Sequence, residues 1–423
     1  MNKYNVVIIG GGAAGLAAAV SYSINTNRPR VLVIEKEKKI GRRLLATGSG
    51  RCNMTNLDMK ASYYNRNARK LIEKVIYKMP PNDLIKYFEK LGLRCRPDSA
   101  GRVYPYSNQA ASVLDTLLLW CSKSEVEILT EIKAECINIS RGGYIVKTNN
   151  GEFLADKLIL SSGGAVQKNL GADGSSYTLA GDVGISVTGT FPSLAPIPVS
   201  DKRLNAVKGV RTAAVVSVAA DGKILHTEEG EMQFNEKNIS GICIFQLSRY
   251  VGEYFTKKGK YKNIEIFIDI APDMTERDLS IYFSAKRKNM PNQPANELFT
   301  GLLNAKLGRY ILQRCGDKIN VEQNIDKFTD KQLEAISREM KRLSFVPSGI
   351  PGGDSAQVTA GGVDLSEIND NFESVKYKGL YIVGEALDVD GMCGGYNLHF
   401  AFSSGIIAGE NAAGSRWEND KNK

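Results

Sequence analysis

A glycine-rich turn near the N-terminus limits the possible folds of this chain more than any other feature. The apolar run Tyr4–Ile9 has the character of a buried parallel strand, and Gly10-x-Gly12-x-x-Gly15 joins it to a run that favours a helix. A second apolar strand over 30–34 ends at Glu35. This order predicts a βαβ unit that binds a dinucleotide, with the pyrophosphate at the helix N-terminus and a ribose on Glu35.

Two later strands also end in small residues. The apolar run 158–162 leads into Gly163-Gly164, and 379–384 ends in Gly384-Glu385 before a glycine-rich loop and a closing helix. An N-terminal fingerprint, a middle strand and a C-terminal Gly-Glu strand are typical of FAD proteins rather than of simple NAD dehydrogenases. We therefore expect a discontinuous Rossmann-like FAD-binding domain formed by residues 1–190 and 351–423.

The middle of the chain has a different pattern. Residues 191–272 read as strands, with a hairpin turn at Asp221-Gly222, and residues 273–350 read as helices. The predicted fold class is α/β, with an inserted β-rich domain followed by an inserted helical domain.

Segment 41–56, GRRLLATGSGRCNMTN, resembles the signature of a bacterial FAD-binding flavoprotein family. Segments 101–105, 240–241, 359–363 and 385–397 resemble it too, so the resemblance runs essentially end to end. Members are known as aminoacetone oxidase family FAD-binding enzymes and bile-acid enone reductase-like proteins, and they include ribosomal RNA dihydrouridine synthases. The resemblance implies an inserted β-barrel-like part and a helical part. One departure is Cys393 and His399, where relatives often have Thr and Gln-like residues.

The expected FAD-binding residues come from these glycine-rich segments and from the family signature. They are Gly10, Gly12, Ala13, Ala14, Gly15, Glu35, Lys36, Arg42, Arg43, Gly50, Arg51, Cys52, Asn53, Ser162, Gly163, Gly164, Gly384, Glu385, Asp390, Gly394, Gly395, Tyr396, Asn397 and Leu398. Backbone N–H groups near 395–398 are expected to face the edge of the flavin that gains negative charge on reduction. Because the sequence contains a single dinucleotide fingerprint, NADH or NADPH is expected only as a transient reductant.

Three residues are candidates for proton transfer beside the flavin. Cys52 is the first, because the charge of Arg51 is expected to lower the pKa of its thiol. The alternative is a small buried cysteine packed under the flavin. Tyr104 and His399 are the other two, although the sequence favours a structural role over a catalytic one for a histidine at a helix start.

The charge of the chain is concentrated at one end. Residues 1–110 contain 20 basic and 7 acidic residues, a balance of +13, although the net charge of the whole chain is only +9. Four basic residues recur at helical spacing and form one stripe. This stripe predicts a surface that binds the phosphates of RNA. The alternative is a helix face that is only solvated. The four residues are Arg66, Lys70, Lys74 and Lys78.

These observations favour an NAD(P)H-linked FAD enzyme that reduces an activated C=C bond, with uridine in ribosomal RNA as the preferred substrate. The alternatives are a reductase of steroid or bile-acid enones, an oxidase of small amines such as aminoacetone, and a flavin-bearing binding protein without turnover. The seven cysteines form no CxxC pattern, so we expect no metal site. No apolar run is long enough to span a bilayer, and we expect a cytoplasmic protein without a membrane partner.

Overall fold

The computed structural model describes residues 3–140, 142–257, 259–316, 320, 323–352 and 355–414. The chain forms two compact units, of which the first combines Met1–Phe191 with Val358–Lys423 and the second is Pro192–Gln357. Short strands β10 (Phe191–Ser193) and β17 (Val358–Ala360) stand where the chain leaves and re-enters the first unit. The predicted α/β fold with a discontinuous Rossmann-like domain is confirmed. The division of the insert at residue 272 stays a prediction.

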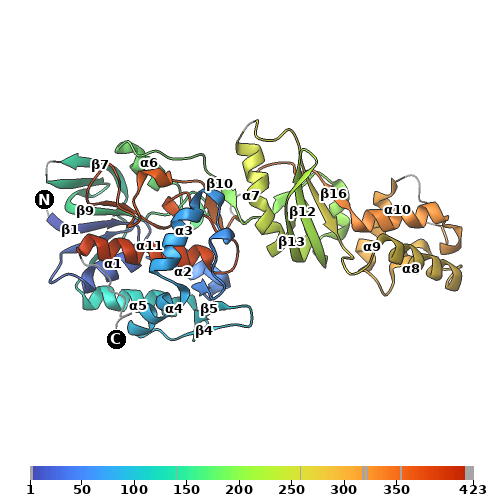
Figure 1. The fold of residues 1–423 in the computed structure, drawn as a ribbon, viewed down its shortest axis with the longest axis horizontal. Helices are drawn as coiled ribbons and strands as arrows, with labels where there is room; N and C mark the ends of the chain where they lie inside the picture. Colours follow the sequence, from blue (N-terminus) through green and yellow to red (C-terminus); the bar gives the residue numbers. More distant parts are fainter. Residues whose placement is uncertain are drawn as a thin grey trace. The chain divides into compact units, whose positions relative to one another are not determined.

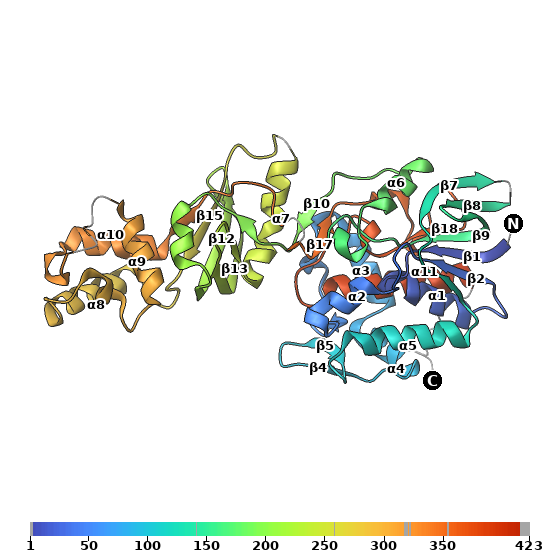
Figure 2. The ribbon, with the colours of Figure 1, turned by 180° about the vertical axis from the view of Figure 1, so that it is seen from behind.

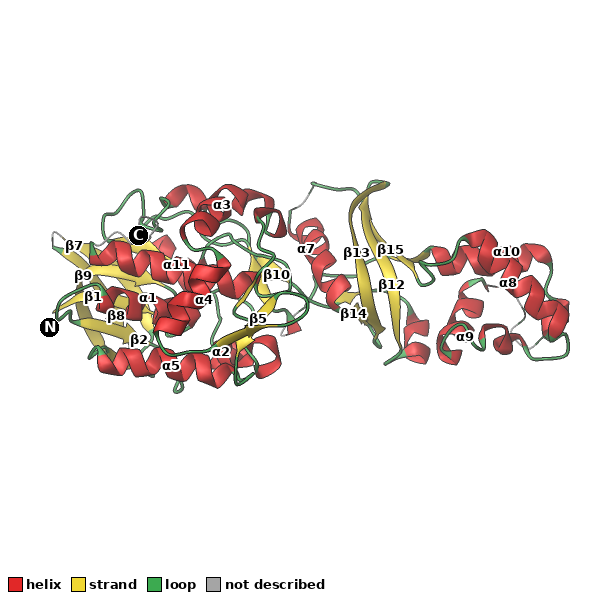
Figure 3. Cartoon of the chain, turned by 60° about the horizontal axis from the view of Figure 1, so that its bottom comes forward, coloured by secondary structure: helices red, strands yellow, loops and turns green. Residues whose placement is uncertain are grey.

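A mixed seven-stranded sheet forms the centre of the first unit (Figure 3). Its order is β6-β2-β1-β9-β8-β7, and β18 also pairs with β9. Strand β9 is long enough to pair with β8 along its first half and with β18 along its second half. The bounds are β1 (Lys3–Ile9), β2 (Val31–Ile34), β6 (Glu127–Leu129), β7 (Ala134–Ser140), β8 (Gly143–Thr148), β9 (Gly151–Leu160) and β18 (Leu380–Ile382).

Strands β1, β2, β6, β9 and β18 are parallel to one another. The carboxyl ends of β1, β9 and β18 therefore lie at one edge, since Ile9 is opposite Leu160 and Leu160 is opposite Ile382. The three glycine-rich segments that follow these strands meet at this edge, where ligands bind in open α/β sheets.

Two helices from opposite ends of the chain pack closely in this unit: α1 (Ala13–Ile24) and α11 (Tyr396–Ala413) (Figure 1). A Cβ atom on Gly405 would overlap with the carbonyl oxygen of Ala14, so glycine permits the approach. The hydroxyl of Ser21 donates a hydrogen bond of 2.9 Å to the carbonyl oxygen of Ile406. The other helices are α2 (Arg42–Ala46), α3 (Arg69–Lys78), α4 (Pro81–Lys90), α5 (Ala110–Lys123) and α6 (Ser175–Asp182) (Figure 2).

A small antiparallel sheet follows the family signature in the chain. It has the order β3-β5-β4, with β3 (Thr55–Asn56), β4 (Cys95–Pro97) and β5 (Arg102–Pro105). One face is apolar, because Val103 is fully buried and the thiol of Cys95 lies 3.7 Å from the sulfur of Met54. The opposite face includes Arg96 and Tyr104, which lie directly across from each other.

The second unit contains a six-stranded antiparallel sheet of order β11-β14-β13-β12-β15-β16. Its two outermost strands are joined by a bridge between Val199 and Pro347, which gives the sheet a barrel-like closure. The β12–β13 turn is Asp221-Gly222, and both residues have positive φ as a tight hairpin requires. The bounds are β11 (Ile197–Pro198), β12 (Arg211–Ala220), β13 (Lys223–Phe234), β14 (Asn238–Ser240), β15 (Ile264–Asp269) and β16 (Leu343–Phe345), with α7 (Ile242–Thr256), α8 (Glu276–Asn289), α9 (Ala305–Arg314) and α10 (Asp330–Lys341).

Candidate functional site

The turn between β1 and α1 has the shape that a pyrophosphate-binding turn requires. Gly10 has a φ of +104°, and a Cβ atom there would lie 2.7 Å from the carbonyl oxygen of Ser161. A Cβ atom on Gly15 would overlap with the carbonyl oxygen of Gly10, so only glycine lets α1 pack this closely. At Gly12, by contrast, no heavy atom lies within 4 Å of the Cβ position. Open space therefore remains in front of Gly12, at the N-terminus of a helix that no side chain caps.

Glu35 is held beside this turn by the backbone. One carboxylate oxygen accepts a hydrogen bond of 2.9 Å from the N–H of Gly11, and the other accepts one of 2.9 Å from the N–H of Glu37. These bonds orient the carboxylate, and each oxygen keeps a further lone pair. Glu35 is thus positioned to accept hydrogen bonds from a ribose diol.

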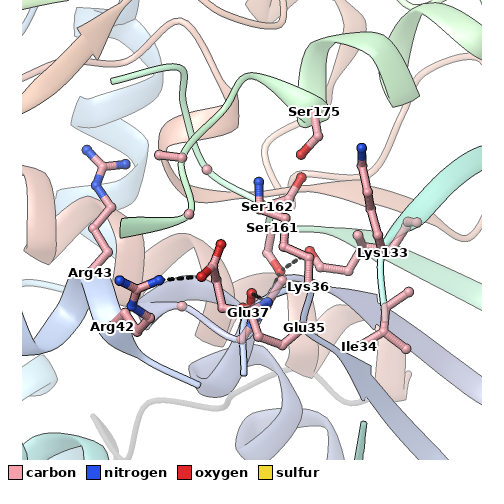
Figure 4. Close-up of a pocket in the computed structure, with 18 of the residues that line it drawn as sticks. Ile34, Glu35, Lys36, Glu37, Arg42, Arg43, Lys133, Ser161, Ser162 and Ser175 are labelled. Carbon is pink, nitrogen blue, oxygen red and sulfur yellow. Dashed lines mark hydrogen bonds and ion pairs between the residues drawn. The ribbon is translucent and has the colours of Figure 1, made fainter. Parts of the chain in front are cut away.

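An open cavity with about 700 Å³ of empty space lies at this edge of the sheet (Figure 4). Figure 4 shows Arg42 paired with Glu37 at one side of it. Eight of the predicted FAD-binding residues line it: Gly10, Gly12, Glu35, Lys36, Arg42, Arg43, Ser162 and Gly163. Sequence reasoning missed Lys133 and Ala134, because nothing in their sequence indicates that the start of β7 reaches this edge.

Glu385 joins the C-terminal part of the site to the N-terminal part. Its carboxylate makes a two-point ion pair with Arg43, at 2.6 Å and 2.9 Å, and also accepts a hydrogen bond of 2.8 Å from the N–H of Thr359. A Cβ atom on Gly164 would overlap with the side chain of Thr359. Glu385 was predicted to bind a hydroxyl of the cofactor, and here much of its hydrogen-bonding capacity is used by the protein.

The glycine-rich loop before α11 packs against the signature segment 41–56. A Cβ atom on Gly395 would lie 2.7 Å from Oδ1 of Asn53, and the amide of Asn56 donates a hydrogen bond of 3.0 Å to the carbonyl oxygen of Gly394. The amide of Asn397 closes the loop by bonding to the backbone of Gly391 at 2.8 Å. The signature segment and the loop before α11 are therefore in direct contact, as two parts of one FAD site would be.

Asp390 is held in the same loop by Asn65. The N–H of Asn65 donates a hydrogen bond of 2.9 Å to the carbonyl oxygen of Asp390, whose own N–H donates one of 3.2 Å to Oδ1 of Asn65. Gly384 follows β18 and lies close to the first turn of α1, since a Cβ atom on it would be 2.9 Å from the Cβ atom of Ala14. The ring of Tyr396 covers Gly394 in the same loop, 2.9 Å from the position of a Cβ atom. The predicted residues Asp390, Gly394 and Tyr396 thus pack within the loop before α11, and Gly384 packs on α1.

The residues present fit a bound FAD on two independent observations. The first is the space kept open at Gly12 and the cavity that extends from it. The second is the pair of buried oxygens that have no hydrogen-bond partner, Oγ of Ser162 and Oδ1 of Asn53. Buried polar atoms are normally satisfied, so unpaired ones at a cavity and at a glycine-rich junction favour a ligand.

The expected activation of Cys52 is wrong. The side chain is fully buried, and this burial raises the pKa of the thiol to about 12 despite a hydrogen bond with Thr47. The guanidinium of Arg51 does not offset the burial, because it lies over the ring of Tyr104, 5.0 Å from the ring centroid. Cys52 therefore keeps its proton at neutral pH. A catalytic role for Tyr104 stays a prediction.

His399 lies inside the protein, in the first turn of α11. Its side chain is 1% exposed, and Nδ1 lies 2.9 Å from the hydroxyl of Thr55. Burial lowers the pKa of the imidazole to about 4, so the ring is neutral at physiological pH. A neutral, enclosed imidazole favours the structural interpretation over proton transfer to a substrate.

The basic stripe is only partly available to an external ligand. Helix α3 begins at Arg69, so Arg66 belongs to the preceding 3-10 turn rather than to the helix. Lys74 forms an ion pair of 2.7 Å with Asp370, and Lys78 donates to the carbonyl oxygen of Asp370 at 2.7 Å. Two of the four predicted RNA-binding residues thus hold a loop of the same unit, leaving Arg66 and Lys70 as exposed cations.

Two features are absent from the described residues. Among them, no group of three or more His, Cys, Asp or Glu side chains is placed to hold a metal ion. Within the same residues, no helix is both long and apolar enough to cross a membrane.

Comparison with known proteins identifies the family. The protein-family model described as the HI0933-like protein Rossmann domain matches residues 4–411 of this chain. The chain belongs to this family. A 3-dehydro-bile acid delta(4,6)-reductase from Clostridium scindens is 35% identical over 418 residues, covering 98% of this chain and 99% of that protein. A ribosomal RNA dihydrouridine synthase from Escherichia coli is 27% identical, covering 96% of each chain.

The solved structures support the same assignment at the level of fold. A 3-ketosteroid delta1-dehydrogenase from Sterolibacterium denitrificans superposes with a TM-score of 0.54 at 13% identity, covering 98% of this chain and 100% of that chain. This likeness is one of fold alone. The family match and the 35% identity to a reductase place the protein, as a member of the HI0933-like family, among the flavoprotein oxidoreductases, and the likeness of fold agrees with this.

Proposed function

We propose that this protein reduces an activated C=C bond of a steroid-type enone with FAD as its cofactor. The observation that supports this most directly is the 35% identity to a bile-acid delta(4,6)-reductase over 98% of the chain. The charge distribution favours ribosomal RNA as the substrate. The sequence identity favours a bile-acid enone instead, so we place the enone first.

The reaction requires two electrons and two protons in total. Bound FAD supplies hydride chemistry, and NADH or NADPH is the proposed source of that hydride. The chain holds the cofactor through the turn at Gly12, the carboxylate of Glu35 and the backbone before α11. It also supplies a proton to the carbon next to the one that accepts hydride. Cys52 and His399 are poorly placed for this step, because both side chains are enclosed in the protein.

The test uses the FAD-loaded protein under anaerobic conditions. A 3-oxo bile acid with double bonds at positions 4 and 6 is incubated with NADH and, separately, with NADPH. We expect a product heavier by two hydrogens and oxidation of one nicotinamide in equal amount. A protein that is fully loaded with FAD but leaves this substrate unchanged with both nicotinamides would contradict the proposal.

A second candidate is dihydrouridine formation in ribosomal RNA. It is favoured by two relatives of that name, at 27% and 28% identity, and by the basic balance of residues 1–110. Deletion of the gene followed by measurement of dihydrouridine in ribosomal RNA separates the two candidates. Loss of the modified base, together with no turnover of the bile acid, would make this candidate the function.

A further inference from the structure

Two arginines at the small sheet β3-β5-β4 lie over tyrosine rings. The guanidinium of Arg51 lies 5.0 Å from the ring centroid of Tyr104, and that of Arg96 lies 5.1 Å from the ring centroid of Tyr106. A guanidinium over an aromatic ring is attracted by the negative face of the ring, which favours this position of the side chain. The fork of N–H donors of a guanidinium matches a carboxylate or a phosphate in geometry.

The register of the sheet places these residues on one face. Arg96 is directly opposite Tyr104, and the N–H of Tyr106 bonds to the carbonyl oxygen of Arg94 at 2.7 Å, which continues the same pairing. Side chains directly opposite or two residues apart share a face and lie within reach of one another. Arg51 reaches this face from the signature segment by covering Tyr104.

The charges of Arg51 and Arg96 are not neutralised by the protein. Arg94 pairs with Glu89 at 3.2 Å, and Arg102 pairs with Asp98 at 2.7 Å. Within the described ranges, no carboxylate pairs with Arg51 or Arg96, and the only hydrogen bond from either side chain runs from Nε of Arg51 to the carbonyl oxygen of Gly48. Both side chains are exposed, so this face has two cations that pair with no carboxylate of the described residues.

This face adjoins the candidate flavin site without being part of its cavity. A Cβ atom on Gly48 would lie 3.0 Å from the N–H nitrogen of Asn53 and 3.8 Å from the ring of Tyr104. Asn53 in turn contacts Gly395 before α11. Arg51 does not line the cavity that Arg42 and Arg43 line, which argues against its predicted role as a cofactor ligand.

We propose that Arg51 and Arg96 bind an anionic group of the substrate, namely the carboxylate of an acidic enone. This inference rests on the proposed function and adds to it a determinant of substrate choice: the enzyme prefers an acid over a neutral steroid of the same ring system. Tyr104 and Tyr106 act as positioning residues that hold the two guanidinium groups.

The experiment compares the same 3-oxo bile acid with double bonds at positions 4 and 6 with its methyl ester, which differ only in charge at the side chain. The FAD-loaded wild type and the variants Arg51→Gln, Arg96→Gln and Arg94→Gln are assayed for KM and kcat, and binding of both compounds is measured by calorimetry. Each of the first two substitutions is expected to raise KM and Kd for the acid about tenfold, as loss of a charge-assisted hydrogen bond predicts. Values for the ester are expected to stay the same. Arg94→Gln is the matched control, because this arginine already has an acidic partner.

Several outcomes would overturn the proposal. One is an equal loss for acid and ester, which would indicate a distorted site, and another is loss of FAD from Arg51→Gln, which would return this residue to the cofactor. A third is weaker binding of a ribosomal RNA fragment by both variants with unchanged binding of the acid, which would identify a phosphate as the ligand. If the wild type binds the acid more tightly than the ester but reduces neither, the proposed function fails and the anion site stands.

Discussion

The guanidinium of Arg43 and the carboxylate of Glu385 form a two-point ion pair across 342 positions of the chain. The pair joins helix α2, within the signature segment, to the loop after β18, and these belong to the N-terminal and C-terminal parts of the FAD-type domain. Both side chains are about one-fifth exposed, so the pair is largely shielded from water.

Breaking this pair is expected to weaken the domain itself. Arg43→Gln or Glu385→Gln leaves one partly buried charge without its partner and should lower the free energy of unfolding by about 1–2 kcal/mol. The double variant should lose less than the sum of the two, which urea unfolding of the FAD-free proteins would measure. Strictly additive losses would mean that the two side chains do not stabilise each other.

Substitutions of two fingerprint glycines are expected to have different effects, one on FAD binding and the other on stability. Gly12 has extended backbone and open space in front of it, so Gly12→Val should fold normally but bind FAD about 100-fold more weakly, as loss of two hydrogen bonds to phosphate predicts. Gly15→Val should instead lower the stability of the FAD-free protein by about 1–3 kcal/mol, because the new side chain collides with the backbone of Gly10. Thermal unfolding and flavin absorbance separate the two effects. Similar melting temperatures for both variants would contradict this assignment.

Stability is expected to fall in mild acid because of His399. The pKa of its imidazole is about 4 in the folded protein, below the value of about 6.5 in the unfolded chain, so the unfolded state binds more protons between these values. The stabilisation is therefore complete above pH 6.5 and is lost as the pH falls toward 4, by roughly 2–3 kcal/mol. Urea unfolding at a series of pH values should show this slope in the wild type and a smaller slope in His399→Gln. An unchanged slope in the variant would assign the effect to another group.

Cys52 is expected to be dispensable for proton transfer. Its thiol has a pKa of about 12 and is fully buried, so Cys52→Ala should keep the pH profile of kcat while lowering stability by about 1 kcal/mol through a small cavity. In the folded wild type the thiol should also resist alkylation at pH 8 and react only after unfolding. A shifted pH profile in the variant would restore Cys52 as a catalytic acid.

Much of the fold could be predicted because its determinants are local. The spacing of Gly10, Gly12 and Gly15 after an apolar strand, and the turn at Asp221-Gly222, each describe a backbone shape that few other residues permit. The change of pattern along the chain likewise predicts an insert over 191–350, and the second compact unit is Pro192–Gln357.

The properties of individual side chains could not be predicted in the same way, because burial and partners are set by contacts between distant segments. Arg51 is next to Cys52 in the chain, yet its charge lies over Tyr104 and the thiol is enclosed. Lys74 and Lys78 form a basic stripe along the chain, yet both bond to residues of a loop nearly 300 positions away.

The sequence by itself thus determined the nucleotide-binding topology and the class of cofactor, since both depend on backbone conformations that glycine spacing encodes. Only the tertiary structure decided which charges remain free. Lys74 pairs with Asp370, nearly 300 positions away, whereas Arg51 and Arg96 lie over tyrosine rings and pair with no carboxylate of the described residues. The reason is that Coulomb energy and desolvation depend on distances in space, which the order of residues does not specify.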